Sequence, residues 1–248
     1  MMEASNGRHA SSIKKAKLYG IRGSAPSFAP ELMLRHKGIP YRRVNLIPDR
    51  HRKRLPAMGF PGSTVPALLV DGRRVQTNRA IARALDEVAP EPRLLPVDRT
   101  ARAEVEAAEL FSDEVFQQAV RRIVLWSLVN DPESVTPDPA IGALPIPRNA
   151  WLRRRLTRRS FEAFGITDAV VREDFEALPE MIDRLDGYMA EGVLNGPDLN
   201  AADFEIAPLI AALLGASYVA TDVVDRPAAK LASRVMSSQP PIEVAEAI

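Results

Sequence analysis

The alternating apolar pattern of β-strands is confined to the part of this chain before Asp98, and this limits the possible folds more than any other feature. Residues 17–21 and 39–46 are predicted as strands, and residues 28–37 between them carry apolar residues at helical spacing. A strand, helix, strand unit makes its two strands parallel, because the crossover returns the chain to the same end of the sheet. The chain therefore opens as an α/β domain.

A second block of strands follows a basic, proline-containing stretch. Residues 64–70 and 73–76 are predicted as strands, and Asp71-Gly72 between them is a strong signal for a two-residue hairpin turn. Thr77 is a favoured cap for a helix over residues 78–88. The order βαβ-ββα predicts an α/β domain, which closes at a proline-rich linker.

After Asp98 the pattern is helical, which predicts an all-α second domain. A stretch with five prolines, residues 130–147, interrupts it and is expected to be a loop and a candidate lid. The expected helices span residues 98–129, 151–164, 170–191, 201–214 and 226–237. The expected organisation is a flexible leader over residues 1–14, an α/β domain over 15–92 and an all-helical domain over 98–248.

Composition narrows the function. The 248 residues contain no cysteine, so thiol chemistry must use a thiol from another molecule. A net charge of +1 disfavours nucleic acid and anionic membranes as partners. No apolar run approaches the roughly 20 residues of a membrane span, and no secretory signal is evident, which predicts a cytoplasmic protein. The three histidines are not paired as in a metal site, and no metal is expected.

The first candidate site lies in Gly23–Ser27, between the first strand and the first helix. Backbone amides at a helix start favour an anion, and a serine hydroxyl can donate to a bound thiolate. Lowering a thiol pKa by about 2 units from about 8.5 corresponds to roughly 2.7 kcal/mol. Ser24 is thus a candidate thiol-activating residue. The alternative is structural, with Ser27 capping the helix and Ser24 completing a polar turn.

Two further segments are candidates for ligand binding. Val65-Pro66 opens a strand, so Pro66 is either at a sheet edge or after a cis bond, and a cis bond would turn the Val65 amide and carbonyl towards an extended ligand. Gln76 and Thr77 precede a helix, where an amide, a hydroxyl and free backbone amides can hold a carboxylate. Taken singly, each segment also has an ordinary structural explanation, an edge proline or a helix cap.

The order and spacing of these segments resemble the glutathione S-transferase superfamily over nearly the whole chain from Lys17. The resemblance rests on Leu18-Tyr19 with Ser24, Gly38-Ile39-Pro40-Tyr41, Val65-Pro66-Ala67-Leu68, Gln76-Thr77-Asn78-Arg79-Ala80-Ile81 and Leu199-Asn200-Ala201-Ala202-Asp203-Phe204. It implies a thioredoxin-like N-terminal domain followed by an all-helical domain. It also implies a homodimeric transferase of alkyl or aryl groups, acting in detoxification, that joins glutathione or another small thiol to an apolar electrophile.

The resemblance assigns roles to the candidates. Ser24, or Tyr19 as in other classes, would activate the thiol, Val65 and Pro66 would contact the cysteinyl unit, and Gln76 and Thr77 would hold the γ-glutamyl carboxylate. Asp203 would complete a capping box, with a role in folding. Trp126, Trp151, Phe161 and Phe164 are candidates for an acceptor pocket or for ordinary core. The glycine carboxylate would pair with Arg54, Lys53 or Arg52.

One departure from the family pattern keeps a second function open. Ala25 separates Ser24 from Pro26, so that Ser24 to Ser27 resembles a thioredoxin site with serine at both cysteine positions. Disulfide exchange is therefore excluded. The alternative to a transferase is a non-catalytic binding or assembly module that keeps the two-domain scaffold.

Overall fold

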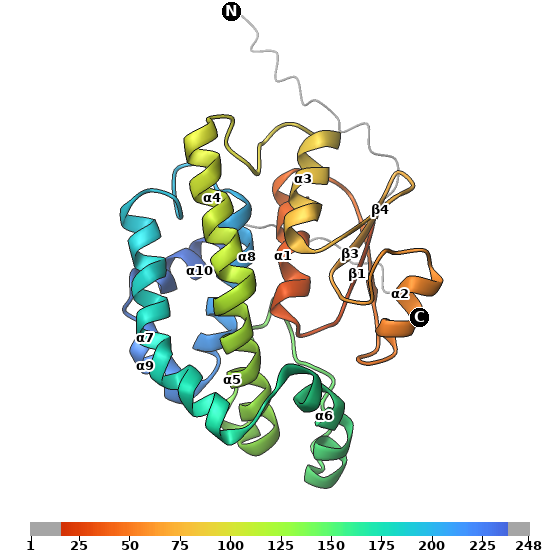
Figure 1. Cartoon of the computed structure of the whole chain (residues 1–248), viewed down its shortest axis with the longest axis vertical. Coiled ribbons are helices and arrows are strands. Elements are labelled where there is room, and N and C mark those ends of the chain that lie inside the picture. The colour runs from red at the N-terminus through yellow and green to blue at the C-terminus, as the bar shows by residue number, and fades with distance from the viewer. Residues whose placement is uncertain (1–15, 238–248) are drawn as a thin grey trace, which may run out of the picture.

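The computed structural model describes residues 16–237, and its first part is a mixed four-stranded sheet (Figure 1). The strands are β1 (Ala16–Gly20), β2 (Arg42–Asn45), β3 (Ala67–Val70) and β4 (Arg73–Gln76), in the order β2-β1-β3-β4. β1 and β2 are parallel, whereas β3 runs antiparallel to both β1 and β4. The predicted α/β architecture is confirmed. The predicted leader, residues 1–14, lies outside the described residues.

Three helices cover this sheet. α1 (Ala25–His36) and α3 (Asn78–Val88) pack on one face, where Leu32 and Ile81 meet Leu18 and Leu68 of the strands. α2 (His51–Ala57) packs on the other face through the buried Leu55. The sequence did not predict α2, because it carries a single buried apolar residue and a proline, Pro56, inside its span. The chain between β3 and β4 turns at Asp71-Gly72 as predicted.

The second part of the chain is helical, as predicted. α4 (Arg99–Phe111), a π-helical turn (Ser112–Phe116) and α5 (Gln117–Asn130) together form the long helix expected over 98–129. The short helix over Ser217–Val223 was not predicted. Residues 131–149 form a loop apart from a 3-10 turn at Pro132–Ser134. The remaining helices are α6 (Ala150–Phe164), α7 (Asp168–Ala190), α8 (Ala201–Leu214), α9 (Ser217–Val223) and α10 (Pro227–Ser237).

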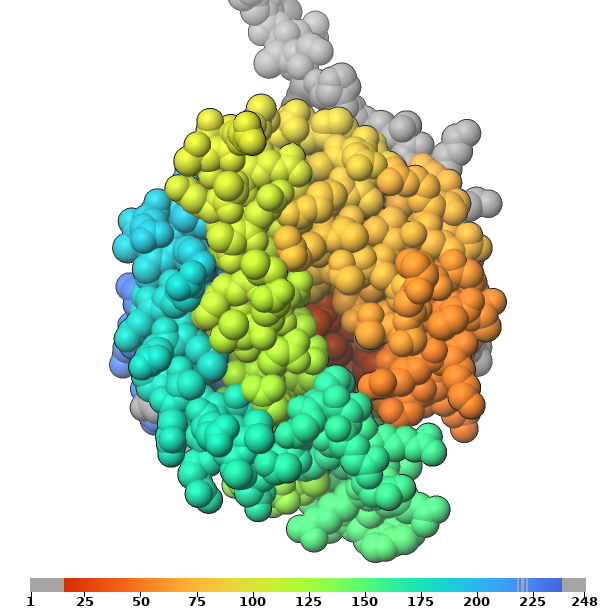
Figure 2. Space-filling model, viewed as in Figure 1, coloured from red at the N-terminus to blue at the C-terminus, as the bar shows by residue number. Residues whose placement is uncertain are grey.

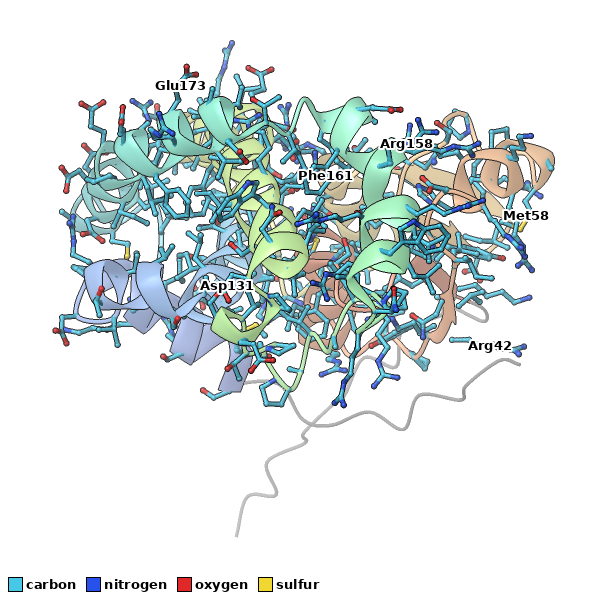
Figure 3. The ribbon with its side chains drawn as sticks, turned by 90° about the horizontal axis from the view of Figure 1, so that it is seen from below. Arg42, Met58, Asp131, Arg158, Phe161 and Glu173 are labelled. Atoms are coloured by element: carbon cyan, nitrogen blue, oxygen red, sulfur yellow. The ribbon has the colours of Figure 1, made fainter. Side chains whose placement is uncertain are left out.

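The sheet part and the helical part share one continuous core, centred on α8. α8 is almost entirely buried, and it packs against α1, α4 and α10. The ring of Phe204 on α8 lies 5.0 Å from that of His36 on α1. Seen from below, α6 lies between the other helices of the helical part and the α2 side of the sheet part (Figure 3). Phe161 of α6 lies on the side towards α5. This arrangement places the β1–α1 turn at the junction of the two parts.

The connection between the two parts is tied down by a buried ion pair. Lys37 Nζ lies 2.7 Å from the carboxylate of Asp86 and donates to the carbonyl oxygens of Ala89 and Pro92. The same carboxylate accepts hydrogen bonds from the backbone N–H groups of Leu94 and Leu95, at 2.9 and 3.0 Å. Both leucines are buried. The linker is thus fixed to the rest of the molecule by both polar and apolar contacts.

The predicted capping box at the start of α8 is present. The Asn200 side chain accepts from the N–H groups of Ala202 and Asp203, at 2.9 and 3.4 Å. The Asp203 carboxylate accepts from the N–H of Asn200 at 2.8 Å and also from that of Asn195 at 2.7 Å. Asp203 is fully buried, so these bonds satisfy backbone groups that water does not reach. Asp203 therefore has the structural role expected from the sequence.

Candidate functional site

Ser24 stands at the start of α1 with its hydroxyl available. Its backbone is extended, with φ −95° and ψ 110°, and its side chain makes no capping hydrogen bond to the helix. Pro26 in the first turn has no N–H to be capped, which removes part of the demand for a side-chain cap. Ser24 is half-buried. Its hydroxyl is therefore free to act on a ligand at the positive end of the α1 dipole.

Ser27 has a different environment from Ser24. Its side chain is completely buried, and its Oγ accepts a hydrogen bond from the N–H of Ile21 at 3.3 Å. The Ser27 hydroxyl then donates to Ser24 Oγ at 3.2 Å. Because Ser24 accepts this bond, its own hydrogen remains to be donated outward. A chain of hydroxyls that polarise one another strengthens the terminal donor.

The Val65-Pro66 peptide bond is cis, as the resemblance implied. The loop before it is held by Gln76, whose Oε1 accepts from the N–H of Gly62 at 2.5 Å and whose Nε2 donates to the carbonyl of Thr64 at 2.8 Å. Both polar ends of the Gln76 side chain are thus engaged within the protein. Gln76 positions the loop that leads into Val65.

Thr77 is the more exposed residue of the predicted pair Gln76 and Thr77. It is exposed and caps α3, its Oγ1 accepting from the N–H of Ala80 at 3.3 Å. Its backbone has φ 72° and ψ 148°, a conformation that costs a β-branched residue energy and that proteins keep mainly at functional sites. Thr77 is exposed, and the cap uses its oxygen as an acceptor only, so its hydroxyl hydrogen can be donated to a ligand. This combination suits a ligand carboxylate.

The remaining predicted residues lie around the α2 side of the sheet. Arg52, Lys53 and Arg54 are all exposed on α2. Tyr19 packs edge to face against Phe60, with ring centres 5.5 Å apart, on the face of the sheet that α2 covers. Figure 2 shows a hollow between the orange surface that includes α2 and the yellow-green surface of α5, with red atoms of the region around β1 and α1 at its base. This cleft is the candidate ligand site.

The proline-rich loop contacts the β1–α1 turn, an approach that the sequence did not predict. The N–H of Gly23 donates to the carbonyl of Ile141 at 3.1 Å. A Cβ built on Gly23 would lie 2.2 Å from the backbone nitrogen of Leu144, and Gly23 has φ 79°. Only glycine allows the loop to come this close. The glycine before Ser24 and the run of prolines were the sequence signals available, but neither indicates which segments meet.

We expect Gly23→Ala to displace the loop over residues 131–148. The added Cβ meets backbone atoms of Leu144, and the positive φ adds strain. The packing of the loop against residue 23 therefore loses stability. Limited proteolysis should show cleavage in this loop at a rate about tenfold above that of the native chain. Gly38→Ala is the matched control, because its φ is also positive, at 62°, but its Cβ would meet nothing within 4 Å. Equal protection of the loop in both variants would contradict the packing described.

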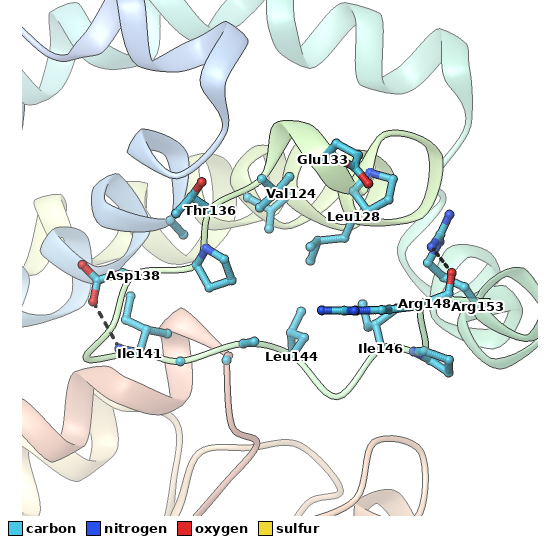
Figure 4. A pocket seen from close by; sticks show the side chains of 18 residues that line it. Val124, Leu128, Glu133, Thr136, Asp138, Ile141, Leu144, Ile146, Arg148 and Arg153 are labelled. Atoms are coloured by element: carbon cyan, nitrogen blue, oxygen red, sulfur yellow. Dashed lines mark hydrogen bonds between the residues drawn. The ribbon is translucent and has the colours of Figure 1, made fainter. Parts of the chain in front are cut away.

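A cavity of about 640 Å³ lies between this loop, α5 and α6 (Figure 4). It reaches Gly23, the residue before Ser24. None of the four aromatic residues suggested for an acceptor pocket lines it. Trp126 donates from its ring nitrogen to Asp168 at 2.7 Å, and Trp151 is 67% exposed. Phe161 and Phe164 pack against the core. The suggested aromatic lining is therefore absent from this cavity, whose walls are mostly aliphatic.

Two other kinds of feature are absent from residues 16–237. No helix in this range is long and apolar enough to cross a membrane. Within the same residues, no group of three or more histidine, cysteine, aspartate and glutamate side chains is arranged to hold a metal ion.

Comparison with known proteins agrees with this geometry. Residues 18–93 match the family model of the glutathione S-transferase N-terminal domain. A protein of Caenorhabditis elegans named as a probable maleylacetoacetate isomerase is 31% identical over 101 residues, which cover 40% of this chain and 47% of that protein. The chain therefore aligns with about half the length of this relative.

Solved structures resemble the chain over most of its length. A glutathione S-transferase of Ceriporiopsis subvermispora, in complex with glutathione, matches with a TM-score of 0.69 and 16% identity over 93% of this chain and 100% of that one. The β-etherase of Sphingobium sp. strain SYK-6 matches with a TM-score of 0.59 and 20% identity over 91% and 100%. At these identities the likeness establishes the fold. With the family match over residues 18–93, it shows a glutathione S-transferase N-terminal domain within a chain that has the fold of these enzymes.

Proposed function

We propose that the chain is a glutathione-dependent transferase in which Ser24 activates the thiol for attack on an apolar electrophile. The observation that carries the proposal is the state of the Ser24 hydroxyl, which accepts a hydrogen bond from Ser27, makes no cap to α1 and is half-buried at the start of that helix. The thiol supplies the nucleophile that a chain without cysteine lacks. Glutathione fits the arrangement, since the cleft combines a hydroxyl donor with exposed cations on α2.

In this mechanism each residue acts on a different part of the tripeptide. The Ser24 hydroxyl donates to the sulfur and, with the α1 dipole, favours the thiolate over the thiol. The Val65 backbone offers its polar groups to the cysteinyl unit, in a position that Gln76 fixes by holding residues 62 and 64. Thr77 and the start of α3 take the γ-glutamyl carboxylate, and Arg54 or its neighbours Lys53 and Arg52 pair with the glycine carboxylate.

The proposal includes two reaction types and an oligomeric state. Conjugation follows when the electrophile loses a leaving group, whereas addition and reversal would isomerise a double bond, the type of reaction that the name of the nematode relative suggests. Leu110 and Val115, which are 41% and 42% exposed on α4 and the following π-helical turn, support a homodimer formed through this face. A cytoplasmic location stays a prediction from the sequence.

Calorimetric titration with glutathione tests the proposal. We expect a dissociation constant between about 1 μM and 1 mM, the usual range for enzyme substrates, and turnover of 1-chloro-2,4-dinitrobenzene with glutathione. S-methylglutathione should bind more weakly, because it has no sulfur charge for Ser24 to stabilise. Cysteine and other small thiols serve as further ligands. If no thiol binds, the non-catalytic binding or assembly module becomes the better description.

A further inference from the structure

The cavity beside Gly23 contains a cation without a protein partner. Arg148 lies where the proline-rich loop meets α6, and its side chain extends into the space between Leu128 and Leu144 (Figure 4). Arg148 is exposed, and within the described part of the chain its backbone carbonyl accepts a hydrogen bond from Arg153 while its guanidinium forms no hydrogen bond or ion pair. Arginine recognises carboxylates through two parallel hydrogen bonds when no internal partner occupies it. This guanidinium is therefore available to a ligand.

The other charged groups that line the cavity are Arg153, Asp138 and Glu133. Arg153 is buried, and its guanidinium donates to the carbonyls of Val129 and Arg148, both at 3.0 Å. The Asp138 carboxylate accepts from the N–H groups of Ala140 and Ile141. Glu133 is exposed and stands beyond Leu128 in the 3-10 turn, at the rim (Figure 4). The Arg153 guanidinium and one carboxylate oxygen of Asp138 thus hold the shape of the loop.

The remaining walls are aliphatic. Val124 and Leu128 come from α5, and Ile141, Leu144 and Ile146 come from the loop. The volume of about 640 Å³ is in the range of small-molecule sites. A ligand that fits such walls has an apolar body, and a carboxylate on that body would be placed to reach Arg148.

We infer that this cavity binds an apolar carboxylate whose charged group pairs with Arg148, and that it selects the electrophile class of the enzyme. The selection of an electrophile rests on the proposed function, because the cavity reaches the residue next to Ser24. The binding site itself does not rest on it. Binding and catalysis are therefore tested separately.

The test measures binding of 3,5-dinitrobenzoate and its neutral amide, 3,5-dinitrobenzamide, neither of which reacts with thiols. Calorimetry on the native chain should show tighter binding of the carboxylate. Arg148→Met should weaken the carboxylate about tenfold, the range expected for a charge-assisted pair at a partly exposed site, and change the amide less than about twofold. Arg154→Met is the matched control, because Arg154 is also exposed, on α6 just after Arg148, and does not line the cavity.

A second variant locates the binding site. Leu128→Trp enlarges a side chain that lines the cavity, so it should weaken both compounds at least about fivefold. The inference would be overturned if the native chain bound the two compounds with equal affinity. It would also be overturned if Arg148→Met left the ratio of the two affinities unchanged, or if Arg154→Met lost as much affinity for the carboxylate as Arg148→Met does. A preference for the carboxylate in a chain that does not bind glutathione would uphold the site and refute the proposed transferase. Turnover with glutathione in a chain that shows no carboxylate preference would support the transferase and refute the carboxylate site.

Discussion

Replacing Ser24 by alanine is expected to lower kcat/KM for conjugation about hundredfold at a pH below the thiol pKa. The variant removes one hydrogen bond to a charged sulfur, worth about 1.5–3 kcal/mol, and the pKa of bound glutathione should rise by about 2 units. The ultraviolet absorbance of the bound thiolate, followed against pH, measures that pKa directly. The melting temperature should stay nearly unchanged, because the Ser24 side chain makes no cap to α1.

Three variants identify the group that activates the thiol. Ser24→Thr keeps the hydroxyl and should retain much of the activity. Ser27→Ala removes the donor to Ser24 Oγ and should cause a smaller loss, since the outward hydrogen of Ser24 remains. Tyr19→Phe should leave the thiol pKa unchanged, because the Tyr19 ring packs against Phe60. Full activity in Ser24→Ala together with loss in Tyr19→Phe would transfer the role to the tyrosine.

The sequence predicted the sheet and most of the long helices, because their apolar periodicity records which face is buried. The hairpin at Asp71-Gly72 and the capping box at Asn200 were predictable for a second reason, since they depend on neighbouring residues alone. α2 and α9 were missed. α2 is a short helix with one buried residue, Leu55, whose packing under the sheet stabilises it. Such stabilisation comes from tertiary contacts that periodicity does not record.

The candidate site was predictable in its residue types but not in its geometry. The sequence left Ser24 and Ser27 as alternatives, and it did not reveal that Ser27 is buried whereas Ser24 is only half-buried. A Cβ on Gly20 would lie only 3.0 Å from the Cβ of Ser27, so the first strand packs closely over that serine. The contact of Ile141 with Gly23 joins residues more than one hundred positions apart. No local pattern reports such a contact.

The second large effect is expected at the start of α8. Asp203→Ala should lower the free energy of unfolding by about 3 kcal/mol and the melting temperature by about 10 °C, because two buried backbone N–H groups lose their acceptor. Asp98→Ala is the matched control. Asp98 caps α4 by accepting from the N–H groups of Thr100 and Ala101, but water reaches this cap, so the loss should be about 1 kcal/mol. Urea denaturation measures both values.

The pH dependence of stability distinguishes the contribution of the Asp203 protonation state from the contribution of its side-chain shape. Burial raises the pKa of Asp203 to about 6, against the opposing effect of the N–H groups of Asn195 and Asn200. In the unfolded chain this pKa is about 3.9, so between these values the folded state binds the proton more strongly. The contribution to stability is therefore complete below about pH 4 and is lost as the pH rises through 6.

Asp203→Asn has no such titration. The stability of the native chain relative to this variant should therefore fall by about 2 kcal/mol between pH 4.5 and pH 7.5. Burial also raises the pKa of Glu109 and Glu205, but these carboxyls affect both proteins alike and cancel in the difference. A difference that does not change with pH would mean that Asp203 is ionised throughout this range. Its two backbone N–H partners would then outweigh burial in setting its charge.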